Sequence, residues 1–169
     1  MKIFSQNILN YDISIPEKST LRINLAWINS IDELKSILKK YVNSDIFLDL
    51  PIGRTKPPNN KYTFDNLISI LENNKNILYL AISNVNSTDD IEEVIKLIPK
   101  HVTLVPKIES SDGVKNIQEI TSLLGDKKII MLDHDDLYSD IVKNNEKPEK
   151  FKEYVTILTD FCQKNKVIM

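Results

Sequence analysis

Short apolar runs alternate with amphipathic segments along most of the chain. The runs are nearly continuous in apolar residues, which predicts strands of a parallel sheet that is covered on both faces. The predicted strands are 21–26, 46–50, 78–83, 102–108, 128–132 and 166–169. Residues 1–5 could add one more strand, which gives a sheet of about six or seven strands.

The segments between these runs predict helices, because their apolar residues recur at helical spacing. Three hydroxyl residues, Ser30, Thr63 and Ser87, are placed to cap helix N-termini. Gly125 is placed to end the fourth helix as the residue after its C-cap. Pro148 suits the first position of a fifth helix.

Alternation of strands and helices with short connections indicates right-handed βαβ units. The pattern fits a TIM-type (β/α) barrel or an open doubly wound sheet. A complete eight-unit barrel typically needs about 250 residues. With 169 residues, the chain predicts a single domain over 1–169 that is, if a barrel, a truncated one.

Composition and charge exclude several classes of protein. Hydrophobic residues make up 41%, charged residues 27%, and the formal net charge is -2, so neither nucleic acid nor a membrane surface is an expected partner. No apolar run approaches the roughly 20 residues of a membrane span, and the N-terminus carries no signal-peptide pattern, which predicts a cytoplasmic protein. Cys162, the single cysteine, is expected to be a buried thiol. Three glycines do not spell a nucleotide-binding fingerprint.

Charged residues follow two successive predicted strands, at the end where parallel α/β folds gather functional groups. Glu109 and Asp136 should face the same mouth, and two neighbouring carboxylates repel one another unless a cation such as Mg²⁺ lies between them. Lys107 points to the same strand face as Glu109. The alternative is that all three are solvated charges where loops begin. His134 has no second His or Cys at zinc-like spacing, and Trp27 is expected to pack under a loop rather than to line a pocket.

Six segments, in order, resemble motifs of the pyruvate kinase barrel over roughly residues 20 to 169. LRINLAW resembles R-x-N-x-S-H, and IFLDL with GRT resembles L-D-x-K-G-P-x-I-R-T. ILYLAISNVNSTDDIEEV resembles F-x-A-x-S-F-V-R-S-x-x-D-V, and DFCQKNKVIM resembles C-x-x-A-G-K-P-V-I. VPKIESSDGVKNIQEI resembles A-K-I-E-N-x-E-G-V-x-N-x-x-E-I, the most specific of the matches. IIMLDHDDLYSDI resembles G-I-M-V-A-R-G-D-L-G-V-E-I.

The resemblance implies a site for phosphoenolpyruvate or pyruvate, that is, for a small carboxylic acid or phosphate ester. By matching position, Glu109 and Asp136 would hold Mg²⁺ or Mn²⁺, and Lys107 would stabilise the transferring phosphoryl group or the enolate. Arg22 would contact phosphate. Asn24 and Asp49 would belong to a monovalent-cation site. Asp135 and Asp136 would bind the substrate.

The chain also departs from the family pattern. Ala26 and Trp27 stand where the family has Ser-His, so one ligand of the monovalent cation is absent. Leu50 stands where the family has another ligand of that cation, and both changes argue against a K⁺ site. Asp135 stands where the family has glycine, and adds bulk and negative charge beside the substrate carboxylate. The sequence has no room for the nucleotide-covering lid domain, and we expect the domain to lack the last barrel strand and the C-terminal domain.

Two other functions therefore stay open. The citrate lyase β-subunit and the class II pyruvate aldolases share the superfamily, have no lid, and carry motifs similar to IESSDGVKNIQEI and DDLYSDI. A Mg²⁺-dependent lyase or aldolase is thus an alternative to a pyruvate-kinase-like transferase. The third hypothesis is a catalytically degenerate barrel that acts as a partner-binding protein or as a homo-oligomer whose copies complete the barrel.

Overall fold

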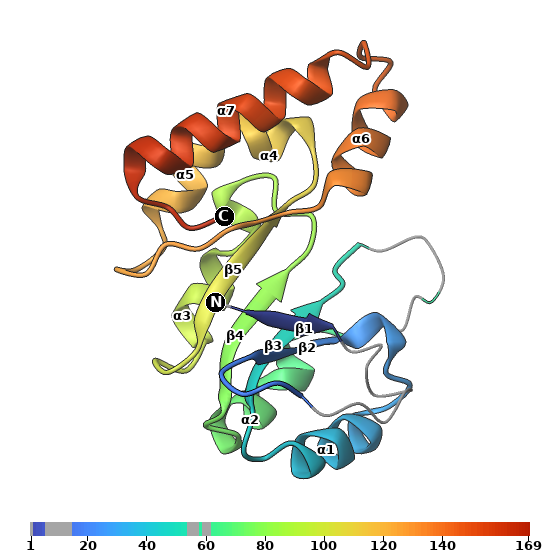
Figure 1. The fold of residues 1–169 in the computed structure, drawn as a ribbon, viewed down its shortest axis with the longest axis vertical. Coiled ribbons are helices and arrows are strands. Elements are labelled where there is room, and N and C mark those ends of the chain that lie inside the picture. Colours follow the sequence, from blue (N-terminus) through green and yellow to red (C-terminus); the bar gives the residue numbers. More distant parts are fainter. Residues whose placement is uncertain (1, 6–14, 54–57, 59–61) are drawn as a thin grey trace. The chain divides into compact units, whose positions relative to one another are not determined.

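The structure is a computed structural model that describes residues 2–5, 15–53, 58 and 62–169 (Figure 1). Most of the polar segment GRTKPPNNK (53–61) lies outside the described residues. The strands are β1 (Ile3–Ser5), β2 (Thr20–Asn24), β3 (Asp45–Leu50), β4 (Ile77–Ile82), β5 (Thr103–Ile108) and β6 (Met131–Leu132). The α-helices are α1 (Ile31–Lys40), α2 (Phe64–Asn73), α3 (Glu92–Leu97), α4 (Ser111–Lys115), α5 (Ile117–Ser122), α6 (His134–Lys143) and α7 (Lys150–Asn165). The described residues also form the 3₁₀ turns η2 (Leu25–Trp27) and η3 (Thr88–Asp90).

The strands form one six-stranded parallel sheet with the order β1-β2-β3-β4-β5-β6. Strands that are consecutive in sequence are therefore neighbours throughout, which is the strand order of a (β/α) barrel. A doubly wound sheet instead reverses its strand order at a switch point. The prediction of a parallel α/β fold with about six strands is confirmed.

Tertiary contacts divide the chain into two compact units. Unit 1 comprises 1–81 and 98–103, and unit 2 comprises 82–97 and 104–169. The prediction of one domain over the whole chain stays a prediction.

Unit 1 has an apolar core between its strands and the inward faces of α1 and α2. Ser30 caps α1 by accepting the Glu33 backbone N–H at 3.1 Å, and Thr63 caps α2 in a capping box with Asn66. The fully buried core includes Leu21, Ile23, Leu34, Ile46, Leu48, Leu67 and Leu71. Both predicted N-caps in this unit are confirmed.

Unit 2 is built on β5, β6 and five helices. The helices α4, α6 and α7 pack against one another. Asp140 of α6 accepts from both the backbone N–H and the hydroxyl of Ser111, at 2.9 and 3.1 Å, which ties α6 to the start of α4. The core residues of this unit include Val105, Ile108, Val114, Ile120, Leu137, Ile141, Leu158 and Cys162. The prediction of a buried Cys162 thiol is thus confirmed.

Two predicted strands are shorter than their apolar runs. The run 128–132 forms only the two-residue β6, and the run 166–169 contributes only a parallel bridge from Ile168 to Ile129. The end of α7 explains the second of these differences. Lys166 takes a left-handed conformation with φ of 55°, and the Val167 backbone N–H donates to the Cys162 carbonyl. A terminal strand over 166–169 is therefore wrong.

Several helix boundaries also differ from prediction. Ser87 caps the 3₁₀ turn η3, and α3 begins only at Glu92. The predicted fourth helix is broken at Asn116 into α4 and α5. Gly125 lies beyond the Leu123 C-cap and does not have a positive φ, so its predicted capping role is wrong. Helix α6, which occupies residues that the pattern left without a helix, was not predicted.

Candidate functional site

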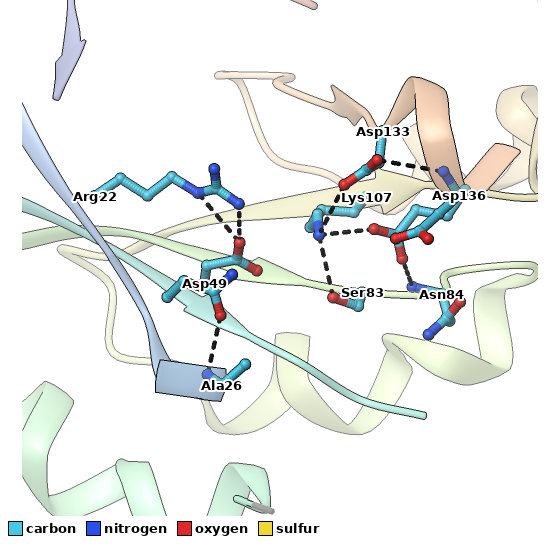
Figure 2. A network of polar contacts seen from close by, with 10 residues as sticks. Arg22, Ala26, Asp49, Ser83, Asn84, Lys107, Asp133 and Asp136 are labelled. Carbon is cyan, nitrogen blue, oxygen red and sulfur yellow. Dashed lines mark hydrogen bonds and ion pairs between the residues drawn. The ribbon is translucent and has the colours of Figure 1, made fainter. Parts of the chain in front are cut away.

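The centre of the candidate site in unit 2 is a buried ion pair at the end of β5. Lys107 and Glu109 are only 5% and 4% exposed, and the Lys107 Nζ lies 2.7 Å from Glu109 Oε1 (Figure 2). The two residues alternate with Ile108 along the strand, so both side chains leave the same face. The Lys107 ammonium also donates to the Ser83 hydroxyl at 3.3 Å. The hypothesis that these residues are merely solvated charges is wrong for this pair.

Glu109 is held from its other side by the loop after β4. Its Oε2 accepts the Asn84 backbone N–H at 2.7 Å. Asn84 has a φ of 56°, in the left-handed region that asparagine tolerates better than most residues. This conformation turns the chain so that the amide of Asn84 faces the carboxylate.

Helix α6 brings two more carboxylates to the same place. Asp133 is the N-cap of α6, and its Oδ1 accepts the Asp136 backbone N–H at 3.4 Å. Its Oδ2 lies 3.7 Å from the Lys107 Nζ. One oxygen each of Glu109, Asp133 and Asp136 lies within 4.8 Å of the others. The sequence prediction included Glu109 and Asp136 in this cluster but missed Asp133.

Burial dominates the electrostatics of Glu109. Desolvation raises the pKa of Glu109, while the Lys107 ammonium and the Asn84 N–H partly offset this rise. The Glu109 Oε1 is fully buried and has no aligned hydrogen bond, so its partner is the ammonium charge at close range. In this structure Lys107 therefore supplies a positive charge beside the buried Glu109 and the part-exposed Asp133.

The donor set fits a hard divalent cation. The three clustered groups are carboxylates and offer only oxygen, which Mg²⁺ and Mn²⁺ prefer and which soft metals do not. Few protein ligands are enough for Mg²⁺, which keeps several waters or substrate oxygens in its shell. Glu109, Asp133 and Asp136 are thus the residues that would hold such an ion.

Unit 1 contains three more of the predicted site residues, Arg22, Asn24 and Asp49. The Arg22 Nε donates to Asp49 Oδ2 at 3.1 Å, and a second bond from Arg22 Nη2 reaches the same oxygen. Asp49 is 1% exposed, and Asn24 pairs with it in the register of β2 and β3. The Asn24 side chain accepts the Ala26 backbone N–H at 2.9 Å, which caps η2. In this structure Arg22 is thus engaged by an internal carboxylate.

The remaining residues singled out from the sequence lie outside these contacts. Asp135 is exposed in the first turn of α6 and is not one of the three clustered carboxylates. The His134 ring lies 6.1 Å from the ring of Phe151 on α7. Trp27 is 55% exposed, so the expectation that it packs under a loop is wrong.

Comparison with known proteins gives a likeness of fold and no family. No protein-family model matches the chain. No curated protein sequence matches it either. Among solved structures, the chain is similar to RipC from Yersinia pestis, with a TM-score of 0.60 and 16% sequence identity over 88% of this chain. The match covers 66% of the RipC chain, just under two thirds of its length. Such a likeness concerns the fold alone.

No helix among the described residues is both long and apolar enough to cross a membrane.

Proposed function

We propose that this chain is part of a (β/α) barrel whose unit 2 site binds a divalent metal and a small acid of the phosphoenolpyruvate or pyruvate type. The observation that carries the proposal is the cluster of Glu109, Asp133 and Asp136 around the buried Lys107. The motif series that resembles pyruvate kinase supports the identity of the acid.

The side chains of the cluster suit chemistry on an enolate. Lys107 would donate a hydrogen bond to an oxyanion that develops on the bound acid, and Ser83 orients the ammonium. Asn84 holds Glu109 in place, so the carboxylate needs no reorganisation when a cation arrives. A bound Mg²⁺ or Mn²⁺ would act as a Lewis acid that polarises the substrate oxygen.

The reaction is either phosphoryl transfer, as in pyruvate kinase, or carbon–carbon bond cleavage, as in the lyases and aldolases of the same superfamily. One observation favours the second. The chain passes from the end of β3 at Leu50 to the start of α2 at Phe64 within a short connection, which leaves no lid domain to cover a nucleotide. A lyase or aldolase needs no such lid.

A calorimetric titration with oxalate, a mimic of the pyruvate enolate, tests the binding proposal. The wild type should bind oxalate only with Mn²⁺ or Mg²⁺ present, and Glu109→Gln should lose this binding. Glutamine keeps an acceptor for the Asn84 N–H, so the fold should survive, which circular dichroism checks. Glu119→Gln, at an exposed position on α5, is the matched control. Equal oxalate affinity in wild type and Glu109→Gln would refute the proposal.

Exchange of the pyruvate methyl protons in D₂O separates the two reactions. A lyase or aldolase forms the enolate of free pyruvate, so metal-dependent exchange is expected without any nucleotide. If oxalate binds but the methyl protons of pyruvate exchange only when a phosphate compound is added, a pyruvate-kinase-like transferase is favoured. If neither binding nor exchange occurs with any divalent metal, the barrel is catalytically degenerate.

A further inference from the structure

Asp133 changes the charge of the site in a way that bears on its substrate. Lys107 contributes one positive charge, and the three clustered carboxylates contribute three negative charges. A bound divalent metal therefore leaves the cluster neutral. Without Asp133, the same metal-loaded cluster would carry one positive charge.

Asp133 also lies beside the Lys107 ammonium, the positively charged side chain that would otherwise bind a phosphate group. Its Oδ2 lies 3.7 Å from the Lys107 Nζ, which is already 2.7 Å from Glu109 Oε1. The ammonium is thus shared between two carboxylates within unit 2. In the pyruvate kinase motif that this segment resembles, G-I-M-V-A-R-G-D, the position of Asp133 is alanine, which brings no competing charge.

The charges of the candidate acids differ strongly. A phosphate ester of a carboxylic acid carries about −2.5 to −3 at neutral pH, whereas a simple oxo acid carries −1. A neutral metal-loaded site gains little Coulomb energy when the ligand carries an additional phosphate charge. The nearby Asp133 carboxylate also repels the phosphate group.

We propose that Asp133 is a specificity-determining residue that makes the site accept a small oxo acid without a phosphate group and reject phosphate esters. This inference rests on the proposed function and narrows its substrate class. It also argues against phosphoryl transfer as the reaction, because Asp133 would weaken the binding of a phosphoryl donor.

Asp133→Asn is the informative variant, because asparagine caps a helix as well as aspartate does and removes only the charge. Asp112→Asn is the matched control, since Asp112 is exposed, belongs to the same unit and pairs with Lys115 outside the cluster. Calorimetry with Mn²⁺ would compare oxalate, which carries about −2 at neutral pH, with phosphoglycolate, a larger phosphate ester that carries about −2.5 to −3. A unit charge about 6 Å away changes affinity roughly tenfold at an intermediate effective dielectric.

The wild type should bind oxalate more tightly than phosphoglycolate, a preference that Asp133→Asn should lower by roughly three- to tenfold and Asp112→Asn should leave unchanged. Equal binding of the two ligands by the wild type overturns the inference and leaves the proposed function standing. An equal loss of both ligands in Asp133→Asn also overturns it, because Asp133 would then act only as a metal ligand or helix cap. Absence of oxalate binding in the wild type overturns the proposed function and this inference together.

Discussion

Gly113→Ala should destabilise the protein although it places a better helix former in α4. A Cβ at this position would lie 2.6 Å from the Val85 carbonyl oxygen and 3.3 Å from the Ile108 Cγ2. Ordinary contact begins at 3.4 Å, so the Val85 carbonyl or the helix must move by 0.8 Å, from 2.6 to 3.4 Å. The Val85 backbone N–H donates to the Lys107 carbonyl at 3.2 Å, which resists that movement.

The magnitude follows from two opposing effects. Overpacking of a tight site costs about 1–3 kcal/mol, while alanine in place of glycine in a helix gains up to about 1 kcal/mol. A net loss of roughly 1–2 kcal/mol in the free energy of unfolding is expected. Urea unfolding followed by circular dichroism measures it as a lower transition midpoint with an unchanged slope.

Gly125→Ala is the control for this prediction. A Cβ at Gly125 would meet nothing within 4 Å, and its φ is not positive. This variant should be neutral or gain about 0.5 kcal/mol, because alanine restricts the unfolded chain. If Gly113→Ala were as stable as Gly125→Ala, the close approach of α4 to the loop after β4 would be wrong.

Three further predictions concern single side chains. Asn84→Ala should cost about 1 kcal/mol more than Asn84→Gly in urea unfolding, because φ is 56° there, and equal stability would contradict the left-handed conformation. Burial raises the pKa of Tyr154 to about 12. The stabilisation that the neutral Tyr154 side chain gives the folded protein should therefore be complete below pH ~10 and be lost as pH rises through about 12. Tyr154→Phe, which removes the 2.6 Å hydrogen bond to Glu146, should abolish this late ultraviolet titration step and cost about 1 kcal/mol, and an unchanged titration would refute the assignment. Burial also raises the pKa of the Cys162 thiol, so a disulfide reagent at pH 8 should react slowly in the folded protein and quickly in urea, whereas fast reaction without urea would contradict its burial.

The sequence pattern predicts the strands well because parallel strands are apolar on both faces. Five of the six described strands have their centres inside predicted runs, and β1 lies in the segment that could add one more. The pattern fails where a polar segment forms a helix. The first turn of α6 is His134, Asp135 and Asp136, which obscures the later spacing of Leu137 and Ile141, its two buried residues.

The missing helix also explains the missed site residue. Asp133 joins the cluster because it caps α6, so a prediction without α6 could not place it. The spacing from Asp133 to Asp136, followed by Leu137 and Ile141, is the available signal, since it combines an N-cap with an apolar helical repeat. The Arg22–Asp49 pair depends on the register of β2 against β3, which a strand pattern alone does not fix.

The proposed metal centre can be tested most directly by a crystal structure grown with Mn²⁺ and oxalate, using anomalous scattering to locate the metal. The proposal predicts a manganese peak at the carboxylates of Glu109, Asp133 and Asp136, with oxalate bound to the metal and the Lys107 ammonium facing an oxalate oxygen. A structure at saturating Mn²⁺ with no peak at these carboxylates, and with Lys107 still paired to Glu109, would contradict it.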